Sequence, residues 1–114
     1  MIYQAKQGDI IIINFDPQAG NEQKGRRPAL IISNKTFNSF TQKGAMVCPI
    51  TNTDRKLKIQ IKLDERTKTT GVIMCDQAKI LDLSKRNVEY IEKAPKDIIW
   101  EAIDIINGFI EYEE

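Results

Sequence analysis

The 114-residue chain contains no histidine. Without an imidazole, Ser/His/Asp and Cys/His nucleophilic catalysis, paired-histidine nuclease chemistry and histidine-containing zinc sites are all excluded. Acid–base chemistry must then depend on Asp, Glu, Lys, Arg, Tyr or a hydroxyl group. Two cysteines are too few for a disulfide framework or a thiolate metal site. We therefore expect Cys48 and Cys75 to be buried as small apolar side chains, and we expect no cofactor and no metal.

Long hydrophobic runs are also missing. The longest, residues 10–13 and 45–50, fall far short of the roughly 20 residues that cross a bilayer, which predicts no contact with a membrane. The N-terminus lacks a basic start followed by an apolar stretch and a cleavage site, so the simplest expectation is a cytoplasmic protein. With 41% hydrophobic and 29% charged residues, residues 1–114 are expected to form a single globular domain.

The net charge of +1 hides an uneven distribution. Residues 1–93 carry 16 Lys and Arg against 10 Asp and Glu, whereas residues 94–114 carry one Lys against six acids. A basic body suits a polyanionic ligand such as RNA. On charge alone, an ordinary solvated surface is the simpler interpretation.

Hydrophobic periodicity predicts a mainly β protein that ends in an α-helix. Residues 57–63 alternate strictly between apolar and polar side chains, as in a half-buried strand. Near the C-terminus, apolar residues recur at spacings of three and four after Pro95 and Asp97, which are typical of a helix start. The further expected strands are residues 10–15, 29–32, 45–50, 71–75, 80–81 and 88–91. The pattern predicts a small, strongly bent antiparallel sheet or barrel with one C-terminal helix.

The segment from residue 15 to residue 28 is long for a connection between two strands and rich in functional side chains. Asn21, Glu22 and Gln23 offer donors and acceptors for base edges, and Lys24 suits phosphate. Arg27 precedes a proline, which biases its backbone to the extended region and makes it a candidate oxyanion clamp. The alternative is a solvated loop with ordinary surface charges.

Several short motifs follow one another in a specific order. They are Gly8-Asp9-Ile10, Phe15-Asp16-Pro17, Gly20, Glu22-Gln23, Gly25, Arg27-Pro28-Ala29, Ile31-Ile32-Ser33, Pro49-Ile50-Thr51, Thr70-Gly71-Val72 and Asp76-Gln77. Over nearly the whole chain this series resembles the MazF/PemK toxin family. The resemblance implies an SH3-like barrel of the MazF/PemK/CcdB type and a homodimer. It also implies the toxin of a type II toxin–antitoxin system, which cleaves single-stranded RNA at specific sequences without a metal and is inhibited by a cognate antitoxin protein.

Carried over residue by residue, the resemblance makes Arg27 and Thr51 catalytic. Chemistry agrees, because RNA can be cut when its own 2′-hydroxyl attacks the neighbouring phosphate, and an arginine and a hydroxyl can stabilise the charge that develops. One branch of the family uses an aspartate where Asp76 stands, as the base. That branch has histidine in place of Asn21 and arginine in place of Met74, so both a catalytic and a specificity role for Asp76 stay open. A turn acid bonded to backbone is the third interpretation.

The resemblance and the side-chain chemistry together give a set of candidate RNA-binding residues. They are Asn21, Glu22, Gln23, Lys24, Asn34, Asn38, Gln77, Lys79 and Arg86. Phe37 or Phe40 could stack a base. Two other functions are kept as alternatives: a non-catalytic SH3-like toxin that inhibits a protein such as DNA gyrase, and an inactive RNA-binding relative.

Overall fold

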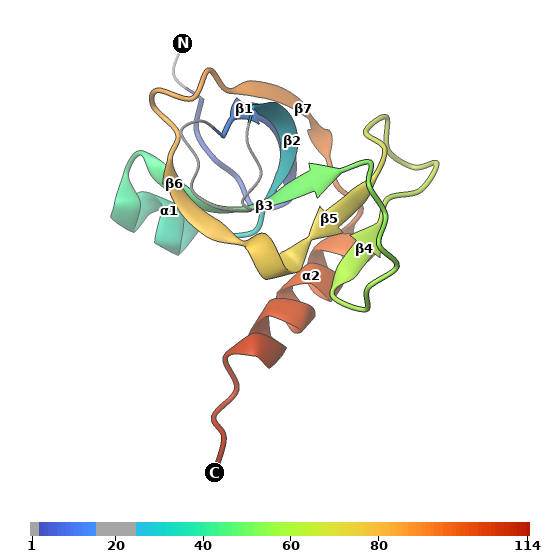
Figure 1. The fold of residues 1–114 in the computed structure, drawn as a ribbon. Helices are drawn as coiled ribbons and strands as arrows, with labels where there is room; N and C mark the ends of the chain where they lie inside the picture. The colour runs from blue at the N-terminus through green and yellow to red at the C-terminus, as the bar shows by residue number, and fades with distance from the viewer. Residues whose placement is uncertain (1–2, 16–24) are drawn as a thin grey trace.

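The protein is a bent, barrel-like β-sheet with one long C-terminal helix (Figure 1). The computed structural model describes residues 3–15 and 25–114, so Asn21, Glu22, Gln23 and Lys24 lie outside the described residues. The elements are β1 (Asp9–Asn14), β2 (Arg26–Ile31), α1 (Lys35–Thr41), β3 (Gly44–Thr51), β4 (Gln60–Lys62), β5 (Val72–Met74), the 3-10 helix η1 (Cys75–Gln77), β6 (Lys79–Asp82), β7 (Glu89–Lys93) and α2 (Lys96–Phe109).

β3 organises the sheet. The strand order is β4-β5-β3-β2-β1-β7, every pair is antiparallel, and β6 also pairs with β3. β2 runs along one edge of β3, while β5 and β6 share the other edge, pairing with its end and its beginning respectively. η1 connects β5 to β6 and therefore interrupts the ladder beside the middle of β3. This interruption places the Asp76-Gln77 motif beside the middle of β3.

Two apolar clusters fill the two faces of the sheet, because alternate residues of a strand point to opposite sides. Ile10, Leu30 and Cys48 belong to one cluster, which α2 covers with Ile98 and Ala102. The other cluster forms around Phe15 and includes Ile11, Ile13, Ala29, Ile31, Ala45, Val47 and Leu83. The expected mainly β fold with a C-terminal helix is confirmed. Within the described residues, none of the helices has the length and apolar character that crossing a membrane requires.

Both cysteines are buried free thiols, as expected. They lie beside each other between β3 and η1. The hydrogen bond with Cys75, together with burial, raises the pKa of the Cys48 thiol. The pair packs as apolar side chains under the turn that carries Asp76.

Two local expectations differ from the structure. The alternating segment 57–63 forms a strand only at Gln60–Lys62, because β4 finds a partner in β5 over just those residues. Leu57, expected to face the core, is 45% exposed. The helix α1 was not expected, and it begins where the side chain of Asn34 accepts a hydrogen bond from the backbone N–H of Phe37 at 3.0 Å.

Candidate active-site cleft

A cleft of about 490 Å³ opens where β2 begins, β3 ends and η1 turns. It contains all three residues expected to be catalytic, Arg27, Thr51 and Asp76, together with Gln77. The complete lining is Arg27, Thr51, Thr53, Arg55, Leu57, Gln60, Met74, Asp76 and Gln77. These four candidates come from three segments of the sequence, around positions 27, 51 and 76–77, and the pairing of β3 with β2 and β5 brings them to one site.

Thr51 is the last residue of β3 and is only 7% exposed. Its Oγ1 accepts a hydrogen bond from the backbone N–H of Thr53 at 3.2 Å, which matches a hydroxyl that caps a turn. A hydroxyl has one hydrogen to donate and two lone pairs. Since the Thr53 bond uses a lone pair, the hydroxyl hydrogen of Thr51 remains available to an acceptor in the cleft.

Arg27 lies on β2 opposite Ile13 of β1, directly before Pro28. The extended backbone that a following proline favours is the one observed, since Arg27 is part of the strand. Its side chain is partly buried and lines the cleft. A strand-borne guanidinium is a rigid fork of donors for the oxygens of a phosphate.

Asp76 is the exposed residue of η1, next to the buried Cys75 that anchors the turn in the core. The interpretation of Asp76 as a turn acid bonded to backbone finds no support, since no residue within 3–15 or 25–114 donates a hydrogen bond to its carboxylate. The carboxylate is therefore open to a ligand on the cleft side.

Gln77 completes the turn with an unusual feature. Its Oε1 is buried and has no hydrogen-bond partner among the described residues, where it is the only such side-chain atom. A buried acceptor without a donor costs on the order of 1–3 kcal/mol. Because the oxygen is buried, a ligand in the cleft could donate to it only after the Gln77 side chain turns toward the cleft.

Sequence reasoning missed the contribution of the β3–β4 connection. Thr53, Arg55 and Leu57 line the cleft from this loop, and Gln60 lines it from the start of β4. The backbone N–H of Arg55 donates to Oε1 of Gln60 at 3.3 Å, which ties the loop to the strand. The signal that could have found them is the polar run that follows Thr51 directly in the sequence.

The other candidate RNA-binding residues lie away from this cleft. Asn34 caps α1, and Asn38 is buried, accepting from the Ser33 hydroxyl at 2.5 Å and donating to the Ala5 carbonyl at 3.3 Å. The Nζ atom of Lys79 lies 5.9 Å from the centre of the Phe15 ring. Arg86 donates to the backbone carbonyls of Asp82 and Asn14, both at 3.0 Å. These side chains hold the fold together, and none of the four lines the cleft.

Fold and site together are those of a small phosphodiester-binding protein. The fold is a small bent β-sheet with a C-terminal helix, and the cleft combines two guanidinium groups, hydroxyl groups and the open carboxylate of Asp76 around a space for a polar ligand. This set can bind a phosphodiester and stabilise negative charge that develops on it.

Comparison with known proteins identifies the family. Residues 6–107 match the family described as PemK-like, MazF-like toxin of type II toxin-antitoxin system, and the chain belongs to this family. It is 35% identical to the endoribonuclease PemK of Escherichia coli over 102 residues, which cover 86% of this chain and 76% of PemK. It is 32% identical to the endoribonuclease toxin ChpB of Escherichia coli strain K12, over 93% of this chain and 94% of ChpB.

A solved structure gives the same result. The crystal structure of MazF (Form-I) from Deinococcus radiodurans superposes with a TM-score of 0.88 and 31% identity, over 96% of this chain and 98% of that one. The expected SH3-like, MazF-type fold is therefore confirmed.

Proposed function

We propose that this protein is the endoribonuclease toxin of a type II toxin–antitoxin system and cleaves single-stranded RNA at specific short sequences. The observation that carries the proposal is the meeting of Arg27, Thr51, Asp76 and Gln77 in one cleft. Relatives named endoribonucleases match most of the chain, which favours cleavage over the alternatives of a gyrase-type inhibitor or an inactive RNA-binding protein. We further infer that residues 1–114 act as one domain, in the cytoplasm, where messenger RNA is available.

In the proposed reaction the RNA supplies its own nucleophile. The 2′-oxygen attacks the adjacent phosphorus, the bond from phosphorus to the 5′-oxygen breaks, and the products are a 2′,3′-cyclic phosphate and a 5′-hydroxyl. The proton of the 2′-hydroxyl passes to water or to Asp76, and the 5′-oxygen takes a proton from water or from the protonated Asp76. All the groups needed for positioning and charge stabilisation belong to the chain or to the RNA, so we expect the reaction to proceed without a metal.

Arg27 and Thr51 are assigned to the phosphate. The guanidinium donates to the non-bridging oxygens, on which negative charge grows as the 2′-oxygen adds. The Thr51 hydroxyl, whose lone pair is occupied by the Thr53 N–H, donates its hydrogen to the same group. Neither side chain needs to change its protonation state for this role.

Asp76 and Gln77 are assigned to the RNA base. The open carboxylate of Asp76 accepts from the exocyclic amino group of a cytosine, and the Gln77 amide oxygen, which has no donor in its buried position, accepts from a base N–H once the side chain turns into the cleft. The same position would also let Asp76 take the 2′-hydroxyl proton. The RNA-binding roles of Asn21, Glu22, Gln23 and Lys24 stay predictions, because these residues lie outside the described part of the chain.

Partners follow from the family. Solved complexes of MazE with MazF from Deinococcus radiodurans, one of them 30% identical to this chain with a TM-score of 0.82, contain a toxin of this fold with its antitoxin. We propose that a cognate antitoxin binds this protein too, with an acidic and apolar segment that competes with RNA for the cleft. We also propose a homodimer, because two clefts related by a two-fold axis form a longer groove than one.

Incubation of the purified protein with a long single-stranded RNA in EDTA tests the function. Cleavage at discrete sites that yields cyclic phosphate ends is the expected result. RNA binding without cleavage would establish the inactive relative, and neither binding nor cleavage would favour a protein target. An RNA and an antitoxin bound together at the cleft in native mass spectrometry would contradict the proposed competition.

A further inference from the structure

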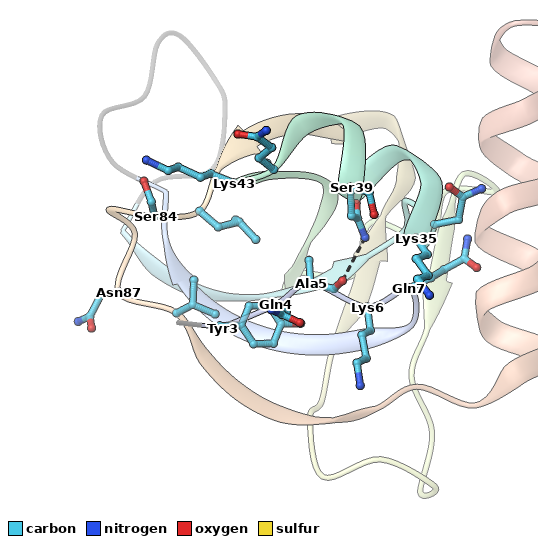
Figure 2. A pocket seen from close by; sticks show the side chains of 16 residues that line it. Tyr3, Gln4, Ala5, Lys6, Gln7, Lys35, Ser39, Lys43, Ser84 and Asn87 are labelled. Carbon is cyan, nitrogen blue, oxygen red and sulfur yellow. Dashed lines mark hydrogen bonds between the residues drawn. The ribbon is translucent and has the colours of Figure 1, made fainter. Parts of the chain in front are cut away.

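A second, larger cavity lies at the opposite end of β3 from the cleft. It measures about 1170 Å³ and is bounded by the N-terminal segment, α1, the start of β3 and the β6–β7 connection (Figure 2). Gly44, the first residue of β3, lines this cavity, and Thr51, the last, lines the cleft. Eight residues at the rise of an antiparallel strand put these ends roughly 24 Å apart. Among the described residues, none lines both cavities.

The charge of this second cavity is one-sided. Its 16 described lining residues include three lysines and no acid, although the whole chain carries 16 Asp and Glu. Lys6, Lys35 and Lys43 come from three separate segments (Figure 2). The side-chain ammonium groups of Lys6 and Lys35 form no hydrogen bond or ion pair with the part of the chain that the structure describes.

Lys43 lies near one carboxylate outside the lining. The pKa of Asp82 is lowered, first by hydrogen bonds from the hydroxyl and backbone N–H of Ser84 and then by the charge of Lys43. Lys43 and Asp82 form no ion pair, so the ammonium group of Lys43 remains available to a ligand.

Polar amides make up much of the remaining lining. The side-chain amides of Asn38 and Gln7 form hydrogen bonds within the fold. Asn38 donates to the Ala5 carbonyl, and Gln7 donates to the Ile32 carbonyl at 2.8 Å. Gln4, Gln42 and Asn87 form no side-chain hydrogen bond to another described residue. Uncommitted amides beside uncommitted ammonium groups suit a ligand that presents both phosphates and base edges.

Resting on the proposed function, we propose that this lysine-lined cavity is a second RNA site, which binds a stretch of the substrate strand distant from the bond that is cut. A cavity larger than the about 300–1,000 Å³ usual for small ligands, in which every charged side chain among the described lining residues is a lysine, fits a polyanionic polymer better than a metabolite. Long RNAs would be held at both ends of β3, and short RNAs at the cleft alone.

The test compares two RNAs and two pairs of substitutions in a Thr51→Ala background, which prevents cleavage without changing charge. The probes are a mixed-sequence single-stranded RNA of about 30 nucleotides and a fragment of about 6 that contains the cleaved sequence. Lys6→Gln/Lys35→Gln removes two charges from the cavity. Lys68→Gln/Lys96→Gln removes two exposed charges from outside both cavities and is the matched control.

The Lys6→Gln/Lys35→Gln variant, called the cavity pair, should bind the long RNA about 25-fold more weakly at 0.1 M salt. The slope of log K against log[salt] should become shallower by about 1.4, since each contact with a single-stranded phosphate contributes about 0.7 to it. Binding of the short RNA should stay unchanged, and the control pair should bind both RNAs like the parent. If the cavity pair lowers the melting temperature, Lys43→Gln alone tests the same cavity, with an expected loss of about fivefold.

Equal affinity of the cavity pair and its parent for the long RNA, or an equal loss with the control pair, would overturn the second site. If either result accompanies normal cleavage by the unmodified protein, only the second site fails. If the unmodified protein neither binds nor cleaves RNA, the proposed function fails with it.

Discussion

Gly71 lies against the backbone of Thr51 so closely that a Cβ atom at position 71 would stand 2.4 Å from the Thr51 carbonyl oxygen. Its φ of +114° is also one that side-chain-bearing residues rarely adopt. The next residue, Val72, pairs with Thr51 across the β3–β5 ladder. The backbone of Thr51, which carries the candidate catalytic hydroxyl, therefore packs against position 71, where only glycine fits.

Gly71→Ala should damage the site and the fold together. The clash and the unfavourable φ are expected to cost about 1–3 kcal/mol of unfolding free energy, and displacement of Thr51 should lower RNA cleavage at least about tenfold. Gly108→Ala is the control, because it adds a Cβ to open space in α2 and should stabilise the protein by about 0.5–1 kcal/mol. Denaturant unfolding and a cleavage assay measure both effects. Wild-type behaviour of Gly71→Ala would mean that β5 can move away from Thr51 at no cost.

Substitutions at the phosphate-binding pair should separate chemistry from folding. Arg27→Ala and Thr51→Val are each expected to reduce cleavage roughly 10²-fold or more, the size of effect seen when one oxyanion donor is removed. Thr51→Ser keeps the hydroxyl and should retain most activity. Single-turnover rates on one RNA, with circular dichroism to check folding, provide the comparison. Full activity in a folded Arg27→Ala or Thr51→Val protein would place the reaction elsewhere.

The fold could be predicted from the sequence where a pattern was long enough to be unambiguous. α2 spans four turns, and its apolar spacing and the acid in its first turn agree with the observed helix. α1 has only seven residues, too few for a periodic signal, and depends on the Asn34 cap and on the burial of Asn38. The alternation of residues 57–63 was real, but a strand also needs a partner, and sequence alternation contains no information on where β5 ends.

The candidate site could be predicted only in part, and for a related reason. Arg27, Thr51 and Asp76 were found because the motifs that contain them are specific. Asn38 and Gln77 have the same side-chain chemistry, yet one is consumed by Ser33 and Ala5 and the other keeps a buried acceptor unused. That difference depends on long-range packing, which the identity of the residue does not show.

Gln77 offers a test of base recognition. Gln77→Leu replaces the buried amide by an apolar group of similar size, which removes the unpaired acceptor, so stability should stay equal or rise slightly. Cleavage should continue but with a changed sequence preference, because a base donor in the cleft would lose its acceptor. Sequencing of the cut ends from a mixed RNA pool measures this. An unchanged cleavage motif would remove Gln77 from base recognition.

The loop before Gly71 is held by Glu92 of β7, and its contribution should depend on pH. The carboxylate accepts from the backbone N–H groups of Lys68 and Thr69, at 3.0 and 2.8 Å. Partial burial alone would raise the pKa of Glu92, but these bonds lower it below the ordinary value of 4.5. Since the folded-state pKa is the lower one, the stabilisation is complete at neutral pH, fades as the pH falls below about 4.5 and is lost below the folded-state pKa.

Glu92→Gln should therefore destabilise the protein at pH 7, by less than about 1 kcal/mol because the side chain is only partly buried and solvent screens its charge. The difference from the unmodified protein should shrink as the pH falls through 4.5. Glu65→Gln, in the same loop and exposed, is the control and should show no such trend. Denaturant unfolding between pH 3 and pH 7 measures the difference. If the difference in unfolding free energy stays constant across that range, the charge of Glu92 does not hold the loop.

Asp76 separates two mechanisms, because its carboxylate is open to the cleft and no imidazole is available to share the proton transfer. If Asp76 takes the 2′-hydroxyl proton, Asp76→Asn should abolish cleavage and remove the acidic limb of the pH–rate profile. If Asp76 instead contacts a base, Asp76→Asn should keep substantial cleavage and change mainly the sequence preference, since an amide cannot replace the negative charge at a cytosine amino group. We expect the second outcome, because Met74 stands where the aspartate-centred branch of the family has an arginine. The pH–rate profiles of the unmodified protein and of Asp76→Asn on one short RNA distinguish the two mechanisms. A correctly folded Asp76→Asn protein without any cleavage would establish Asp76 as the base.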